Sequence, residues 1–178
     1  MRNSNTKEVL LRMLELALRW HVSLSMFVYG IAKTVQFSPA AEVGSPVNEL
    51  TGQQLMWAFY GYSIGYAKFL GIVEMIGAVL LLFRRTTLLG CLVVTVVLVN
   101  VIAQDIVYGV LEGALRAAII YQVLTVFVVL LNWEQVARVW QALTTPGATP
   151  AILRWYWLAF GALGILIITL SLERAITH

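Results

Sequence analysis

Apolar residues gather in five long runs along the chain, and short stretches rich in polar residues, glycine or proline separate them. A helix needs roughly 20 mostly apolar residues to cross a hydrocarbon core of about 30 Å. Backbone groups cannot stay unpaired in lipid, and the runs lack the two-residue alternation of a transmembrane strand, so each run predicts a helix. We expect these helices at residues 14–37, 57–83, 87–108, 117–132 and 152–172.

The second run carries a clear helix start. Thr51 and Gln54 have the spacing of a capping box, so this helix is expected to begin before its apolar residues do. Counted over residues 52–83, it would be about 48 Å long at 1.5 Å per residue. A span of that length must protrude, tilt or bend, and Gly61 and Gly65 mark the place for a bend.

The last run stands apart from the others. The preceding loop reads Thr-Thr-Pro-Gly-Ala-Thr-Pro, a sequence typical of a break between helices. We therefore predict an all-α, polytopic transmembrane helical bundle. A four-helix membrane domain is expected over residues 1–143, and a linker with an additional C-terminal transmembrane helix over residues 144–178.

Composition supports a membrane protein and excludes several functions. Of 178 residues, 60% are apolar and 12% are charged, against about 45–50% and about 25% in soluble domains. Five spans leave no room for a soluble catalytic domain. Cys91 is the only cysteine, so a disulfide within the chain is excluded. No nucleophile triad, phosphate-binding loop or metal-ligand cluster has usable spacing, which argues against an autonomous hydrolase, an ATPase or a metal site.

Basic residues outside the runs predict the orientation. If all five runs cross, the side of the N-terminus receives Arg2, Lys7, Arg12, Arg84, Arg85, Arg138 and Arg154, and the other side receives Arg116 and Arg174. Cytoplasmic loops carry the excess of lysine and arginine. We therefore expect a bacterial-type inner membrane, a cytoplasmic N-terminus and an outside C-terminus, and the basic balance does not indicate nucleic-acid binding.

Ionised residues within the runs are the main candidates for chemistry. A charge facing lipid at mid-membrane costs about 2.5–3.5 kcal/mol on insertion scales, so such groups turn toward protein or water and pair. Glu15, Arg19 and Lys33 share one face of the first helix. The alternative, that Glu15 and Lys33 only reach from the helix ends toward the membrane surfaces, stays open.

Counting depth at 1.5 Å per residue predicts which charges meet. Arg19 and His21 fall at the level of Glu74 near the inner side, which predicts an Arg19–Glu74 pair. Lys33 and Lys68 fall in the outer half, where Asp105 is their expected partner. Two amides lie beside Asp105, and they either join helices or take part in the site. The polar seam of candidate ligand-binding residues is therefore Arg19, His21, Lys33, Lys68, Glu74, Asn100, Gln104 and Asp105.

A family resemblance rests on three short motifs. Arg19 followed by Tyr29-Gly30-x-x-Lys33, then Gly71-x-x-Glu74-x-x-Gly77-Ala78-x-Leu80-Leu81, and then Arg84-Arg85 before a third apolar run, resembles the DoxX/DoxD-like membrane proteins. The resemblance covers residues 12–132. It implies a four-helix bundle in which Arg19, Lys33 and Glu74 are the family's charged positions. The run after Pro150 departs from that pattern.

The resemblance also carries a functional expectation. Some DoxX/DoxD-like proteins are associated with membrane redox systems, including a quinone-reducing thiosulfate oxidoreductase, and others are linked to methylamine utilisation or have no assigned activity. With the polar seam, this predicts a non-autonomous subunit of a redox assembly whose seam binds a quinone or lets protons reach one, with no covalent cofactor. Its expected partners are the bilayer and other membrane subunits or a second copy. A small-solute, ion or proton transporter and a structural assembly subunit are the alternatives, and enzymatic activity would belong to a quinone-linked oxidoreductase complex.

Overall fold

The computed structural model describes residues 2–37, 44–145 and 155–177. Within these ranges the chain is helical and contains no strand, so the predicted all-α class is confirmed there. The chain forms two compact units, Met1–Ala137 and Arg138–His178. The elements of the first unit are α1 (Arg2–Gln36), the 3-10 turn η2 (Val47–Glu49), α2 (Gly52–Tyr62), α3 (Ile64–Leu82), α4 (Thr87–Tyr108), α5 (Glu112–Leu131) and the start of α6 (Trp133–Thr144).

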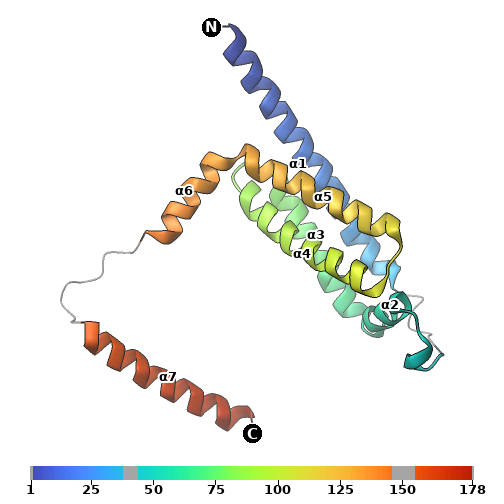
Figure 1. The fold of residues 1–178 in the computed structure, drawn as a ribbon, viewed down its shortest axis with the longest axis vertical. Coiled ribbons are helices and arrows are strands. Elements are labelled where there is room, and N and C mark those ends of the chain that lie inside the picture. Colours follow the sequence, from blue (N-terminus) through green and yellow to red (C-terminus); the bar gives the residue numbers. More distant parts are fainter. Residues whose placement is uncertain (1, 38–43, 146–154, 178) are drawn as a thin grey trace. The chain divides into compact units, whose positions relative to one another are not determined.

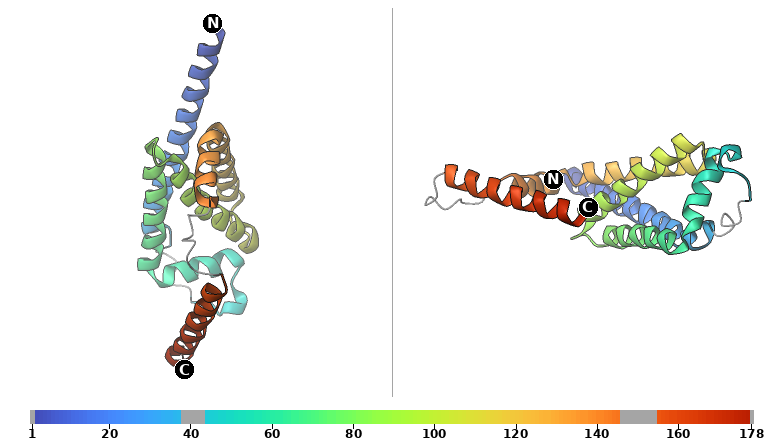
Figure 2. Two further views of the ribbon diagram at one scale, coloured as in Figure 1. Left: turned by 90° about the vertical axis from the view of Figure 1, so that its left-hand side faces the viewer. Right: turned by 90° about the horizontal axis from the view of Figure 1, so that it is seen from below.

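Four helices of the first unit close into a ring (Figure 1). α1 packs on α3, α3 on α4, α4 on α5, and α5 returns to α1. The shorter helix α2 packs on α3 and α4 at one end of this bundle. α1 continues beyond the other end of the bundle with its N-terminal half (Figure 2). α2 therefore covers one end of the ring.

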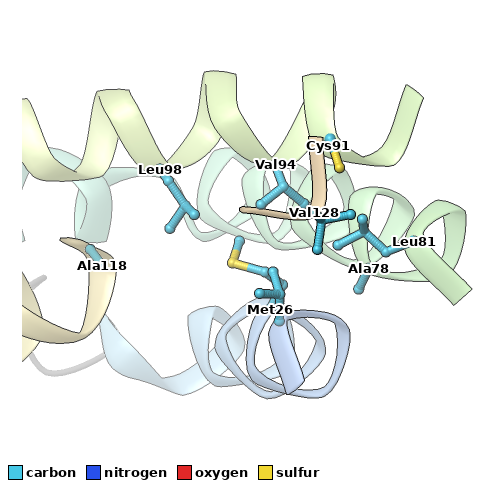
Figure 3. Close-up of a cluster of buried hydrophobic side chains, with 9 residues drawn as sticks. Met26, Ala78, Leu81, Cys91, Val94, Leu98, Ala118 and Val128 are labelled. Atoms are coloured by element: carbon cyan, nitrogen blue, oxygen red, sulfur yellow. The ribbon is translucent and has the colours of Figure 1, made fainter. Parts of the chain in front are cut away.

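An apolar cluster fills the centre of the ring. Met26 reaches from α1 toward Val94 of α4 and Val128 of α5 (Figure 3). Residues three or four apart share a helix face, so each helix contributes one stripe to this core. Because lipid is as apolar as these side chains, close packing and not water exclusion stabilises them in a membrane. The cluster consists of Val22, Met26, Ala78, Leu81, Cys91, Val94, Leu98, Ala118 and Val128.

Four of the described helices are long and apolar enough to cross a membrane. They are α3, α4, α5 and the stretch Trp157–Thr177 of α7 (Trp155–Thr177). Large apolar side chains on their outer faces stay exposed, as Leu92 of α4 and Phe127 of α5 do. The chain is therefore an integral membrane protein in contact with the bilayer. α1 is not among these four helices, because ionised and polar side chains lower its mean hydropathy. Four of the five predicted crossings are therefore supported.

The predicted helix at residues 57–83 is divided in two. Its capping box is confirmed, because Thr51 Oγ1 accepts a hydrogen bond from the Gln54 amide at 3.3 Å and Gln54 Oε1 accepts one from the Thr51 amide at 2.9 Å. The helix breaks at Ser63, whose backbone is extended and whose hydroxyl caps α3 by accepting from the Tyr66 amide. Of the three alternatives for this long helix, the structure shows the bend near Gly61 and Gly65, and it is a complete break.

The other predicted bounds agree with the structure to different degrees. α4 covers Thr87–Tyr108, the predicted range. It ends at Gly109, whose φ of 62° is the left-handed conformation that glycine adopts without strain. α5 starts at Glu112 and not at residue 117. The predicted start is too late because glycine and arginine interrupt the apolar run in the first two turns of the helix.

No helix was expected at α6, and the structure shows why hydropathy misses it. Its apolar residues come singly or in pairs between polar residues, and four of them, three or four positions apart, share one helical face. The residues on this face are Trp133, Val136, Trp140 and Leu143, and the opposite face carries Glu134, Gln135, Arg138 and Gln141. Periodicity, and not mean hydropathy, is the signal that identifies such an element.

α1 and α3 run antiparallel in close contact. Ser23 Oγ donates to the carbonyl oxygen of Ala78 at 2.8 Å. Further along, Gly30 lies against Gly71, and a Cβ atom added to Gly30 would lie 2.6 Å from the Gly71 carbonyl oxygen. Only residues without side chains allow backbones this close. This crossing brings the two helices together at the level of the charged residues described next.

Candidate functional site

A cavity of about 360 Å³ lies between α1, α2, α3 and α4. Aromatic and aliphatic side chains form most of its wall, and a few charged and amide groups project into it. Lining residues from α1 and the segment after it are Lys33, Gln36 and Phe37, and those from α2 are Met56 and Tyr60. α3 contributes Tyr66, Phe69, Leu70, Val73 and Glu74, and α4 contributes Val96, Val97, Asn100, Val101, Gln104 and Asp105.

A buried ion pair joins α1 to α3 at this cavity. Lys33 Nζ lies 3.2 Å from Glu74 Oε1. The same ammonium group lies 5.8 Å from the ring centroid of Phe37, within reach of a cation–π interaction. Glu74 Oε2 has no hydrogen-bond partner among the described residues. One oxygen of this carboxylate is thus paired, and the other is available to an occupant of the cavity.

The pair forms because of the direction in which helical side chains lean. Each Cα–Cβ bond of an α-helix tilts toward the N-terminus of its own helix. Since α1 and α3 are antiparallel, Lys33 and Glu74 lean toward each other and meet near the Gly30–Gly71 crossing. Counting Cα depth neglects both this lean and the length of the lysine side chain. The pairing predicted between Lys33 and Asp105 is therefore wrong.

Asp105 faces the cavity from α4, and only 5% of its surface is exposed. Its Oδ2 atom has no hydrogen-bond partner within the described part of the chain. With Lys33, Glu74 and Asp105 all ionised, the wall carries one positive and two negative charges, a net charge of −1. The cavity therefore holds a carboxylate without a counter-charge of its own.

A short chain of hydrogen bonds orders the amide side of the cavity. Tyr60 Oη donates to Gln104 Oε1 at 2.7 Å, and Gln104 Nε2 donates to Asn100 Oδ1. The Tyr60 ring packs against the Phe37 ring at 4.8 Å and is nearly parallel to the Tyr66 ring at 6.1 Å, both measured between centroids. These contacts fix an aromatic wall that joins α2 to α1, α3 and α4.

Arg19 lies outside this cavity and has different partners from those predicted. Its guanidinium lies 2.9 Å from Glu15 and donates to the Leu81 carbonyl oxygen at 3.1 Å and to the Thr87 hydroxyl at 2.8 Å. The predicted Arg19–Glu74 pair is wrong. Glu15 is one helical turn away on the same face, and the end of α3 offers a free carbonyl, so both are closer than Glu74.

Arg19 thus ties three helices together at the end of α3. Asn132 extends the connection to the end of α5, because its amide donates to Glu15 Oε1 at 3.2 Å and to the Val128 carbonyl oxygen at 2.9 Å. The groups that Arg19 contacts, Glu15, the Leu81 carbonyl and Thr87, all belong to the bundle. The structure therefore gives Arg19 a structural role.

The variant Arg19→Met is expected to lose about 2–3 kcal/mol of unfolding free energy, because it leaves Thr87, the Leu81 carbonyl and Glu15 without their buried partner. Unfolding of the detergent-solubilised protein, followed by far-UV circular dichroism, measures this loss. Arg12→Met, at an exposed position of the same helix, is the control and should change stability by less than about 0.5 kcal/mol. Equal stability of the two variants would contradict the role assigned to Arg19.

Two other members of the predicted seam also lie outside the cavity. Lys68 is exposed, because the buried face of α3 follows Ala67, Gly71 and Glu74 and residue 68 lies about a quarter turn away. His21 is exposed as well, on the far side of α1 from the buried stripe, with its ring 6.0 Å from that of Tyr121. Their predicted membership of the seam is wrong.

The other five members line the cavity: Lys33, Glu74, Asn100, Gln104 and Asp105. The aromatic wall was not predicted. Its signal in the sequence is the density of aromatic residues on either side of Ser63, since Tyr60, Tyr66 and Phe69 fall within ten positions. Hydropathy treats these residues as ordinary members of an apolar run.

Comparison with known proteins identifies one relative and no family. No family model matches the chain, and no solved structure matches it. The uncharacterized protein YwoB of Bacillus subtilis is 36% identical over 86 residues, which are 47% of this chain and 55% of YwoB. The chain is therefore similar to YwoB over about half of each protein.

Proposed function

We propose that this protein is a quinone-binding membrane subunit of a redox assembly, and that the cavity between α1, α2, α3 and α4 is the binding site. The observation that carries the proposal is an aromatic cavity of about 360 Å³ with a few convergent polar groups. Small-molecule sites in proteins have this character and measure roughly 300–1,000 Å³. The volume suits one substituted ring.

The wall supplies the contacts that a quinone ring needs. The nearly parallel rings of Tyr60 and Tyr66 offer flat apolar surfaces for stacking. Lys33 is a charged donor, and Asn100 carries an amide that can also donate to a ring oxygen. The polar side chains of the wall can form hydrogen bonds with the ring oxygens and exchange protons with them. The electrons would come from a partner subunit. This division of work is the reason for proposing a non-autonomous subunit.

The DoxX/DoxD resemblance supports the same proposal. Two of its charged positions, Lys33 and Glu74, form the ion pair at the cavity. The third, Arg19, lies outside the cavity and joins α1 to α3 and α4. Membership of that family, and a link to quinone-dependent redox systems, are therefore part of the proposal.

We also propose that α1 is the fifth crossing. From Ser23 to Gly30 it lies directly on α3, a helix long and apolar enough to span the membrane. Its charges at Arg19 and Lys33 are buried against protein, so they do not oppose insertion as lipid-facing charges would. With the basic residues of the connecting segments, a five-span topology places the N-terminus in the cytoplasm and the C-terminus outside.

Purified protein in lipid nanodiscs is expected to bind tritiated decylubiquinone at one saturable site. Val101→Phe should weaken this binding at least tenfold, because Val101 lines the cavity and a phenyl ring would fill part of it. Val99→Phe makes the same change on α4 at an exposed position outside the cavity, and it should bind as the wild type does. No saturable binding by the wild type, or equal affinity of the two variants, would overturn the proposal.

A further inference from the structure

The hydrogen-bonding groups of the cavity are not balanced. Glu74 Oε2 and Asp105 Oδ2 are both buried, and neither has a hydrogen-bond partner among the described residues. The residues that carry them are 2% and 5% exposed. A buried acceptor without a donor destabilises the protein, and more so when it is charged. An occupant that donates to these two oxygens would therefore gain the most from binding.

Several donors of the wall are already engaged. The Lys33 ammonium is paired with Glu74 Oε1, the Tyr60 hydroxyl donates to Gln104, and the Gln104 amide donates to Asn100. Lys33 keeps further N–H groups for a ring oxygen, since an ammonium has three. The two free carboxylate oxygens can only accept while they are ionised. The cavity thus presents a donor at Lys33 and unpaired acceptors on α3 and α4.

The two oxidation states of a quinone differ in what they offer such a wall. The oxidised ring carries two carbonyl oxygens, which accept hydrogen bonds and donate none. Placed here, it would leave Glu74 Oε2 and Asp105 Oδ2 unpaired. The reduced ring carries two hydroxyl groups, each of which donates one hydrogen bond and can still accept one, and Lys33 can donate to one of them.

We infer that the cavity selects the reduced form, a quinol, over the quinone, with Asp105 and Glu74 accepting hydrogen bonds from its hydroxyl groups. This inference rests on the proposed function and adds which redox form the site holds. Glu74 faces the cavity from α3 and Asp105 from α4. A 1,4-diol also has hydroxyl groups on opposite edges of a flat ring, which suits acceptors on two different walls.

Competition against bound tritiated decylubiquinone in nanodiscs under anaerobic conditions tests this selection. Unlabelled decylubiquinol is expected to compete at least tenfold more strongly than unlabelled decylubiquinone. In Asp105→Asn, which replaces an acceptor-only group by one that also donates, this ratio should fall at least fivefold, and the affinity for decylubiquinone should not fall. Glu112→Gln, at an exposed position on α5, is the matched control and should keep the wild-type ratio.

The outcomes separate the inference from the proposed function. Equal or stronger competition by decylubiquinone in the wild type would overturn quinol selection and leave quinone binding in place. Absence of saturable binding by either form would overturn both. If Asp105→Asn does not fold, the wild-type ratio and the rise in Tm with each ligand still decide, since the better ligand stabilises the protein more at equal concentration. A ratio unchanged in folded Asp105→Asn would overturn the role of Asp105.

Discussion

Replacing Lys33 by methionine is expected to destabilise the bundle by about 3–5 kcal/mol, because the change leaves Glu74 buried without its counter-charge. Methionine keeps most of the length and flexibility of the lysine side chain, so lost packing contributes little. The double variant Lys33→Met/Glu74→Met should recover most of the loss. Two well-packed apolar side chains in place of a buried pair are often neutral or stabilising.

The size of this effect depends on burial, and the chain offers an internal comparison. Arg116 pairs with Glu112 on α5, but both side chains are largely exposed. Arg116→Met should therefore cost less than about 1 kcal/mol. Denaturant unfolding of the detergent-solubilised variants measures all three changes, with Lys68→Met as an exposed lysine control. If the double variant were as unstable as Lys33→Met alone, the loss could not be assigned to an uncompensated Glu74.

Features set by local sequence could be predicted from the sequence. The range of α4 follows from a long, mostly apolar run that ends at a glycine, and the start of α2 follows from a capping box within four residues. The break at Ser63 leaves only a weak trace, because aromatic residues on both sides keep the hydropathy high. α6 escapes for the opposite reason, since its polar face lowers the mean hydropathy of a regular helix.

The sequence predicts which residues belong to the candidate site better than it predicts which of them pair with one another. Burial of charge in an apolar run identifies Lys33, Glu74 and Asp105 from the sequence alone. Which of these charges pair depends on how far one helix is shifted along its axis relative to the next. A single contact between the two helices sets that shift. Depth predicts Glu74 as the partner of Arg19, but a carbonyl at the end of α3 lies closer. The aromatic wall depends on the turn at Ser63 that folds α2 back over the cavity.

The contact that sets the position of α1 along α3 is the crossing of Gly30 and Gly71. A Cβ atom on Gly71 would press against the backbone carbonyl of Gly30, and neither backbone can turn aside as a flexible side chain would. Gly71→Ala is therefore expected to lose about 2–3 kcal/mol of unfolding free energy, near the upper end for overpacking. It should also weaken decylubiquinone binding several-fold, because α1 carries Lys33 away from Glu74 when the helices separate.

Gly161→Ala is the matched control for Gly71→Ala. Gly161 also lies within a helix, but a Cβ atom there would meet nothing within 4 Å among the described residues. Alanine at that position should leave stability unchanged or raise it by up to about 1 kcal/mol, since alanine favours helix more than glycine does. The same glycine-to-alanine change is thus expected to lower stability at Gly71 and not at Gly161, as measured by thermal unfolding in detergent. A Gly71→Ala protein as stable as Gly161→Ala would mean that α1 and α3 do not meet at these glycines, and the Lys33–Glu74 pair would lose its geometric basis.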